Sequence, residues 1–376
     1  MSKRRINVQN RIYLDNAATT KPKKEVIELA ISLLKEHWEN PNSIYSFGKF
    51  SREIIEDSRK TIANKINANP EEIIFCPSAS AANSLAILGY LRKNRVECFV
   101  TSNIEHDSIL NIEMPLHVKR ELVECNTEGI ISPTLLNKYK NSLVSIGAAN
   151  SEIGTIQDLK LMSVIVHKNN CVFHSDLTQY IPYYPVDVKE IGLDMATFSA
   201  HKLGGLRGCA VLYVKKGIDL SPLIAGHQEK GLMGGTENTI AIACMGKAME
   251  LLNYENTINL THLSVYLFDC LDNCGINFHF NGDFCDRLAN NTNICINDLK
   301  IDNQQLISLL DLENIQVSAG SACNAGTNKP SRVLKAIGLS DDEVNKSIRI
   351  TIGNETTYED IDRFVQILKN IIEMNK

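Results

Sequence analysis

Residues 195–205 read MATFSAHKLGG, a short apolar run that ends in small and polar residues. Met195–Phe198 has the length and composition of a buried β-strand, and Lys202 follows within a few residues. At such a strand end the amine is partly removed from water. This lowers the pKa of a lysine and favours the neutral form, which can form a Schiff base. The alternative is an ordinary lysine between strand and loop, and this segment taken alone favours that alternative.

The pattern of a short apolar run with a polar end recurs along the first two-thirds of the chain. The runs are Ile73–Cys76, Cys98–Thr101, Leu143–Gly147, Cys171–His174, Met195–Phe198 and Cys209–Val214. Helix-like segments separate most of them, and such alternation is typical of a mostly parallel sheet with helices on both faces. The sequence therefore predicts an α/β fold, in which ligands bind at the carboxyl ends of the strands.

Helical spacing of apolar residues predicts helices over 23–38, 47–67 and roughly 236–254. The chain after residue 255 carries signals of its own, with a strand at Ile348–Ile352 and a final helix at Tyr358–Met374. We expect a large domain over 13–255. A smaller α/β C-terminal domain is expected over 256–376, joined by residues 1–12.

Length and composition restrict the class of protein. A chain of 376 residues corresponds to about two to three domains. Thirty-nine basic and forty-four acidic residues give a net charge of −5, which argues against direct nucleic-acid binding. No apolar run approaches the roughly 18–20 residues that cross a bilayer, and the N-terminus lacks the apolar core of a secretory signal. We expect a soluble cytoplasmic protein with no membrane partner.

Eleven cysteines are scattered along the chain, mostly within apolar segments, and no C-x-x-C motif occurs. Isolated cysteines in apolar runs are expected to pack as small hydrophobic residues, so the sequence predicts reduced thiols and no metal site. Cys323 is different, because its neighbours Gly320–Thr327 are small and turn-prone. An exposed loop is the setting in which a nucleophilic thiolate can reach a substrate.

Polar residues after the predicted strands are candidates to bind a cofactor. Asp176 could keep the pyridine nitrogen of pyridoxal phosphate protonated, which makes the ring an electron sink. Capping of a helix is the alternative role for this aspartate. Gln179, Ser199 and His201 could contact the ring oxygen and the phosphate.

Two more strand ends contribute candidates. Residues 78–83, SASAAN, open a predicted helix. The free backbone N–H groups at a helix start suit a phosphate. Simple capping of the helix explains the serines equally well. His106 could stack on the cofactor ring and move protons. A structural histidine is the alternative there.

Taken together, the motifs resemble a known family. The matching segments are Tyr13–Thr20, Asn40–Ser43, Glu105-His106, Glu152–Gly154, Asp176 with Gln179, Ser199–Lys202, Gly235-Thr236 and Ser318–Cys323. In this order and spacing the chain resembles the pyridoxal-phosphate-dependent cysteine desulfurases of aminotransferase fold type I, class V. The length of the segment around Cys323 is similar to that of the branch with a long catalytic loop.

The resemblance implies a homodimer that converts L-cysteine to L-alanine and leaves the sulfur as a persulfide on Cys323. From there it would pass to an acceptor protein, such as a scaffold of iron–sulfur cluster assembly or an enzyme of tRNA or other thiolation. The implied cofactor residues are Lys202 as the Schiff-base lysine, Asp176 at the ring nitrogen, His106 on the ring face, Ala79, Ser80, Ser199 and His201 around the phosphate, and Thr236 reaching the partner subunit's phosphate. Arg349 is implied to hold the substrate carboxylate, as a guanidinium can do at two points. A surface salt bridge is its alternative role.

The sequence also departs from this family. Ser151 stands where the second asparagine of an Asn-Asn-Glu motif is usual, close to the ring and the substrate. Asn150 is not expected to replace it, because neighbours on a strand point to opposite faces. Further departures are Ser78, Ser80, Ala81, Tyr45 and Met233. Two alternatives therefore stay open: another pyridoxal-phosphate enzyme, such as a selenocysteine lyase or β-elimination enzyme, and a diverged partner protein with low activity.

Overall fold

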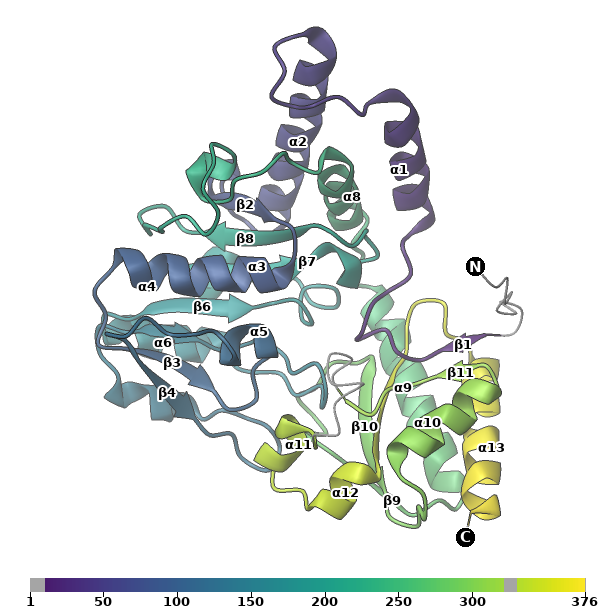
Figure 1. Cartoon of the computed structure of the whole chain (residues 1–376). Coiled ribbons are helices and arrows are strands. Elements are labelled where there is room, and N and C mark those ends of the chain that lie inside the picture. The colour runs from purple at the N-terminus through teal and green to yellow at the C-terminus, as the bar shows by residue number, and fades with distance from the viewer. Residues whose placement is uncertain (1–10, 321–329, 376) are drawn as a thin grey trace.

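The computed structural model describes residues 11–320 and 330–375, and a seven-stranded sheet lies at its centre (Figure 1). Across the sheet the strands are β2 (Ile73–Cys76), β8 (Ala210–Val214), β7 (Met195–Ser199), β6 (Val172–Asp176), β5 (Leu143–Ser145), β3 (Cys98–Ser102) and β4 (Lys119–Val123). From β7 to β4 all neighbours are parallel, and β8 alone runs antiparallel to both of its neighbours. The predicted mostly parallel α/β sheet is confirmed.

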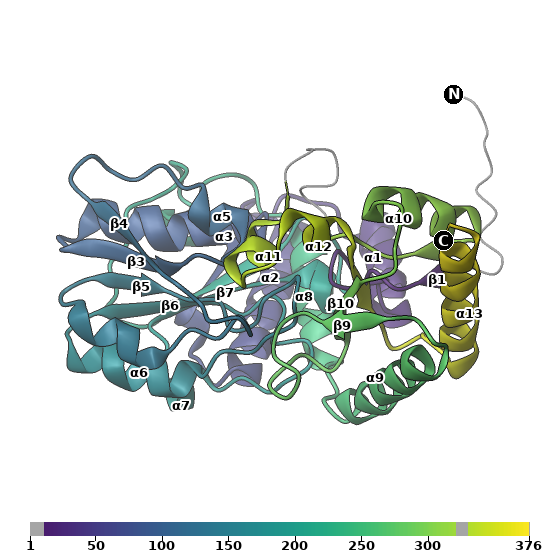
Figure 2. The same cartoon turned by 90° about the horizontal axis from the view of Figure 1, so that it is seen from below.

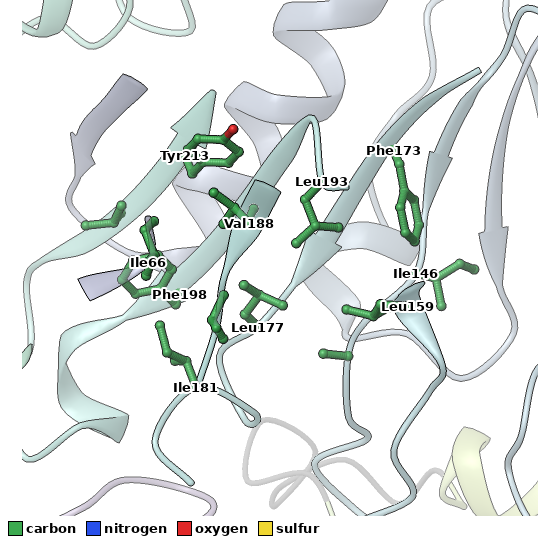
Figure 3. Close-up of a cluster of buried hydrophobic side chains, with 14 of the residues drawn as sticks. Ile66, Ile146, Leu159, Phe173, Leu177, Ile181, Val188, Leu193, Phe198 and Tyr213 are labelled. Atoms are coloured by element: carbon green, nitrogen blue, oxygen red, sulfur yellow. The ribbon is translucent and has the colours of Figure 1, made fainter. Parts of the chain in front are cut away.

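Except at the edge strand β4, both faces of this sheet are buried, which explains why the strands read as apolar runs. In β2, Ile73 and Phe75 join one hydrophobic cluster, whereas Ile74 and Cys76 join another. Successive side chains of a strand point to opposite faces, so the two clusters are the cores on the two sides of the sheet. Figure 3 shows part of the first core, where Phe173 and other apolar side chains cover the strands.

Helices form the outer layers, and Figure 2 shows them on both sides of the sheet. The first core takes side chains from α1 (Lys24–Glu36), α2 (Ser46–Lys65), α6 (Leu159–Lys168), α7 (Val188–Ile191) and α8 (Thr239–Glu250). The second takes them from α5 (Asp107–Leu110) and from a helical segment formed by α3 (Ala79–Ser84), a π-helical stretch at Leu85–Gly89 and α4 (Tyr90–Lys93). The helices expected over 23–38, 47–67 and 236–254 correspond to α1, α2 and α8.

A smaller unit lies beside the large sheet, at the lower right of Figure 1. Its elements are the antiparallel strands β9 (Phe278–Phe280), β10 (Asn291–Ile296) and β12 (Ser347–Thr351), the parallel pair β1 (Ile12–Tyr13) and β11 (Ile315–Gln316), and the helices α9 (Asn256–Asn273), α10 (Asn303–Leu312) and α13 (Tyr358–Met374). A separate hydrophobic core holds them together and includes Ile12 and Leu14. Residues near both ends of the chain therefore share one core.

Two short helices of the C-terminal part pack differently. Val333 and Leu334 of α11 (Arg332–Ala336) and Val344 of α12 (Asp341–Asn345) belong to the core of the large sheet. The expected division into 13–255 and 1–12 with 256–376 stays a prediction. The packing of α11 means that the segment after residue 330 returns to the large unit.

Ten cysteines lie in the described ranges, and all of them have free thiols. Cys76, Cys98, Cys171, Cys209 and Cys244 are buried, as expected for cysteines in apolar runs, whereas Cys125 is half-buried. In these same ranges, none of the helices is both long enough and apolar enough to cross a bilayer.

Candidate active site

The carboxyl ends of the central strands border a cavity of about 380 Å³. Eleven residues singled out from the sequence line it, namely Ala79, Ser80, His106, Asn150, Ser151, Asp176, Gln179, Ser199, His201, Lys202 and Arg349. They come from six different segments of the chain. The structure thus brings them together in one place, whereas their individual roles remain predictions.

Two predicted residues do not belong to this lining. Thr236 is exposed in the segment before α8 and does not border the cavity. Cys323 lies outside the described residues.

Lys202 lines the cavity just after the end of β7. It closes a 3-10 turn, Ala200–Lys202, that directly follows the strand. Its Nζ donates hydrogen bonds to the carbonyl oxygens of Ala17 and of Ala18, the latter at 2.6 Å. The side chain therefore connects β7 to the segment that follows β1, and the amine lies beside the cavity.

Asp176 is the last residue of β6, and both of its carboxylate oxygens accept hydrogen bonds. Oδ1 accepts from the backbone N–H of Thr178 at 2.9 Å, and Oδ2 accepts from Nδ2 of Asn83 at 2.8 Å. The residues after Asp176 form turns rather than a helix, so the alternative role as a helix cap is wrong. Two donors instead hold the carboxylate in one orientation.

His174, two residues before Asp176 on β6, is uncharged at neutral pH. Burial lowers the pKa of His174 to about 4, although the Asp176 carboxylate opposes this shift. Its ring lies between the hydroxyl groups of Ser145 and Thr197, at 2.8 and 3.1 Å. These contacts fill both ring nitrogens and fix the strand that presents Asp176.

His106 combines a structural role with a place at the cavity. Its Nδ1 accepts a hydrogen bond from the backbone N–H of Ser108 at 3.1 Å and so caps the first turn of α5. The ring is nevertheless exposed and borders the cavity. Both interpretations of this histidine are compatible with its position.

Arg349 lies in the middle of β12 and is 1% exposed. Its Nη2 donates to Oδ1 of Asp15 at 2.7 Å, and its Nη1 donates to the carbonyl oxygen of Ser151 at 3.0 Å. Its Nε is buried and has no hydrogen-bond partner among the described residues. The alternative of a surface salt bridge is therefore wrong, because this ion pair is almost fully enclosed.

Asn150 and Ser151 lie in a turn, so the strand argument made for them from the sequence is wrong. Oδ1 of Asn150 accepts from the backbone N–H groups of Glu152 and Ile153 at 2.8 and 3.1 Å, which folds the turn. Nδ2 of Asn150 donates to the carbonyl oxygen of Ile104 at 2.9 Å. The asparagine thus ties the turn that carries Ser151 to the segment that carries His106.

The start of α3 offers backbone N–H groups on the other side of the cavity. Ser78 caps this helix, since its Oγ accepts from the N–H of Ala81 at 3.2 Å. The first N–H groups of a helix have no partner within the helix, and here they belong to Ala79 and Ser80. His201 lines the same cavity, and burial together with Lys202 and Arg207 lowers its pKa to about 4. It is therefore a neutral hydrogen-bonding group.

Two buried acidic residues, Glu105 and Glu152, also line the cavity, although no role was expected for them from the sequence. Burial raises the pKa of Glu105 to about 7, and its carboxyl accepts from Ser102 Oγ at 2.6 Å and from the N–H of Gly147 at 3.0 Å. Burial also raises the pKa of Glu152. In the sequence, only its position directly before His106 indicated Glu105 as a site residue.

Arg332 is a further residue at the cavity that was not expected from the sequence. From the start of α11 its Nη1 donates to Oδ1 of Asp107 at 2.8 Å, and its Nη2 donates to the carbonyl oxygen of Glu105 at 2.7 Å. The guanidinium therefore holds the residues on both sides of His106. This contact fixes α11 against the large unit beside the cavity.

Comparison with known proteins identifies the family. Residues 12–364 match the family described as aminotransferase class-V. The chain belongs to the class-V aminotransferases. A relative from Dictyoglomus turgidum, named cysteine desulfurase IscS, is 37% identical over 381 residues, which cover 97% of this chain and 95% of the relative.

Solved structures agree with this class-V assignment. The X-ray structure of a NifS-like protein from Rickettsia africae is 34% identical, covers 96% of this chain and 99% of that chain, and has a TM-score of 0.87. The structure described as SspA in complex with cysteine is 30% identical, covers 92% of this chain and all of that chain, and has a TM-score of 0.80.

Class-V aminotransferases use pyridoxal phosphate, and the cavity of this class-V chain fits that cofactor. Thr178 lines the cavity, and its Oγ1 is buried without a hydrogen-bond partner in the described part of the chain, which marks a polar group that a ligand could satisfy. A carboxylate, a lysine amine and a set of helix-start N–H groups surround the same space. These groups match the ring nitrogen, the aldehyde and the phosphate of the cofactor.

Proposed function

We propose that the chain is a pyridoxal-phosphate-dependent cysteine desulfurase, which converts L-cysteine to L-alanine and takes the sulfur onto Cys323. The observation that carries this proposal is the gathering of Lys202, Asp176 and Arg349 around one cavity. They provide an amine and a carboxylate for the cofactor and a guanidinium for an amino-acid substrate. Relatives named cysteine desulfurase, 34–37% identical over nearly the whole chain, support the same reaction.

The cofactor would be held at three points. When bound, pyridoxal phosphate supplies an electron sink for bond cleavage in the amino acid. Nζ of Lys202 would hold its aldehyde end, and the carboxylate of Asp176 would keep its ring nitrogen protonated. Gln179 would contact the ring oxygen. The phosphate would be bound by Ala79, Ser80, Ser199 and His201, of which His201 is kept neutral by burial.

Arg349 would bind the carboxylate of L-cysteine. A guanidinium can offer two parallel N–H groups to a carboxylate, and in this chain it is already fixed by Asp15 and the carbonyl of Ser151. The turn formed by Asn150 and Ser151 also lines the cavity and contacts Arg349 through the Ser151 carbonyl. These two residues would restrict how the amino acid is placed.

Proton transfer would use Lys202 and His106. Nζ of Lys202 would remove the α-proton of the substrate and later return a proton to carbon. The imidazole of His106, exposed at the cavity, would assist at the sulfur side. Both groups lie on separate segments that the hydrogen bonds described above hold in place.

Sulfur transfer would depend on Cys323. Its thiolate would attack the substrate sulfur, so that the C–S bond breaks and a persulfide forms on Cys323, while the carbon fragment leaves as L-alanine after protonation. The persulfide sulfur would then pass to an acceptor protein of iron–sulfur cluster assembly or of tRNA or other thiolation. The free thiols of the described residues support a reducing cytoplasmic location in this proposal.

The active form would be a homodimer in which Thr236 reaches the phosphate bound by the partner subunit. Its exposed position outside the cavity of its own protomer supports this role. An apolar surface on α1, α2 and their connection supports association. Its exposed side chains are Ile27, Ile31, Leu34, Trp38, Ile44, Tyr45, Phe47 and Phe50.

A single-turnover reaction with L-cysteine tests the proposal. Purified protein with bound cofactor should yield equal amounts of L-alanine and of persulfide, and the persulfide should map to Cys323 by mass spectrometry. Cys323→Ala should bind the cofactor normally and form no persulfide, whereas Cys285→Ala, which removes an exposed thiol elsewhere in the chain, should behave as the unmodified chain. Unchanged alanine production by Cys323→Ala would refute the proposal and favour a β-elimination enzyme.

A further inference from the structure

Asn83 connects two parts of the candidate site, although it does not line the cavity. It lies on α3 and is fully buried. Its Nδ2 is 2.8 Å from Oδ2 of Asp176 and 2.9 Å from Oγ of Ser108. One amide nitrogen therefore contacts the end of β6 and the first turn of α5.

The chemistry of these contacts fixes the direction of each hydrogen bond. A carboxylate oxygen only accepts, so the Asn83 amide must present its nitrogen, and the reverse orientation would bring two acceptors to 2.8 Å. The second N–H of the same nitrogen is donated to Oγ of Ser108, which leaves the Ser108 hydroxyl hydrogen available.

That hydrogen is directed to His106. Oγ of Ser108 is 2.8 Å from Nδ1 of His106, and the backbone N–H of Ser108 also donates to Nδ1 at 3.1 Å. A nitrogen that accepts two hydrogen bonds carries no hydrogen of its own. The neutral imidazole therefore has its hydrogen on Nε2.

We propose that Asn83 and Ser108 are positioning residues that couple Asp176 to His106 through one chain of hydrogen bonds. Their importance for catalysis rests on the proposed function, because that function assigns Asp176 to the cofactor nitrogen and His106 to proton transfer. The carboxylate of Asp176 sets the orientation of the Asn83 amide. The amide then determines whether the Ser108 hydroxyl donates to His106.

The consequence is a switch of tautomer that depends on residue 176. If the group at position 176 becomes a donor, the Asn83 amide turns and presents Oδ1. The Ser108 hydroxyl then donates to this oxygen, and Nδ1 of His106 loses one of its two donors. The loss of one ordinary hydrogen bond changes the ratio of the two neutral tautomers by about fivefold.

The test is nitrogen NMR of histidine side chains in the full chain, recorded with and without the cofactor. In the unmodified protein the neutral His106 should show hydrogen on Nε2. Asp176→Asn should move the two ring-nitrogen signals of His106 toward each other. The same substitution in a Ser108→Ala or Asn83→Leu background should leave their separation nearly unchanged. Ser84→Ala, the next residue on α3, serves as the matched control background, in which the full effect should persist.

The possible NMR results distinguish a failure of the proposed coupling from a failure of the proposed desulfurase function. Equal convergence of the signals in all backgrounds, or none in any, would overturn the coupling. Because Ser108→Ala keeps every backbone contact of α5, it answers the question even if Asn83→Leu does not fold. The NMR result without cofactor needs no turnover, so a chain that makes no alanine from L-cysteine would refute the proposed function and leave the coupling intact.

Discussion

Arg349 and Asp15 form an ion pair in which Nη2 lies 2.7 Å from Oδ1, while the arginine side chain is 2% exposed and the aspartate side chain 20%. The two residues come from opposite ends of the chain. A guanidinium so deeply buried needs a partner to offset the loss of hydration. Asp15 provides this partner, beside the place proposed for the substrate carboxylate.

Replacing this partner should lower stability. We expect Asp15→Asn to reduce the free energy of unfolding by about 2 kcal/mol, because a buried cation loses its counter-ion. Denaturant titration at neutral pH would measure the change. The control is Glu355→Gln, which breaks the exposed pair with Lys21 and should cost less than about 0.5 kcal/mol. Equal losses in the two variants would contradict this account.

Arg349→Lys should impair substrate binding more than the chemical step. Lysine keeps the charge and cannot offer two parallel N–H groups to a carboxylate. We expect KM for L-cysteine to rise about tenfold or more, with a smaller fall in kcat. Steady-state alanine production measures both. Arg363→Lys on α13, where the guanidinium donates to the carbonyl oxygen of Glu313, is the control and should leave KM unchanged. An unaltered KM in Arg349→Lys would argue against its assigned role.

Glu105 should make stability depend on pH. Its pKa is about 7 in the folded chain against an ordinary value of 4.5, so the folded state binds more protons between these values. The contribution of Glu105 to folding stability is therefore present below pH 4.5 and is lost as the pH rises through 7. Relative to that of the unmodified chain, the free energy of unfolding of Glu105→Gln should rise by up to about 3 kcal/mol between pH 4.5 and 8.

Unfolding titrations across this pH range would measure that gain. The Gln oxygen can accept from the N–H of Gly147 and its amide nitrogen can donate to Ser102 Oγ, which separates loss of charge from loss of hydrogen bonds. Glu113→Gln, at an exposed position, is the control. A constant difference between Glu105→Gln and the unmodified chain at all pH values would show that Glu105 does not titrate in this range.

Arg332 should hold the segment around His106. We expect Arg332→Ala to increase hydrogen exchange at the amides of residues 107–110 by about tenfold, because the ion pair with Asp107 and the bond to the Glu105 carbonyl are both lost. Exchange followed by mass spectrometry would detect this change. Lys335→Ala on the same helix removes only an exposed pair with Asp341 and should have no effect on these amides.

The buried strands could be predicted from the sequence because both faces of the sheet are covered. Ile73–Cys76 was expected and coincides with β2. In contrast, β4 was missed. Lys119–Val123 lies at the edge of the sheet, pairs only with β3 and has Val123 as its one buried residue, so it lacks the apolar run by which strands are recognised.

The candidate site could be predicted only in part. Lys202 and Asp176 follow strands directly, and parallel strands bring such residues to one edge. The contact between Asn83 and Asp176 joins residues 93 positions apart and depends on how α3 packs over the sheet. Likewise, nothing in the sequence indicates that Arg332 returns to the large unit. Such contacts follow from tertiary packing rather than from local pattern.

The pairing of β1 with β11 has a consequence for biosynthesis. Ile12 is made near the beginning of translation, yet its partner Ile315 leaves the ribosome only near the end. The segment from β1 to Ala18, whose carbonyl oxygens accept from Lys202, must therefore wait unpaired while the large sheet forms. Formation of the cavity is thus a late event, so a prematurely terminated chain would contain a nearly complete sheet and no assembled site.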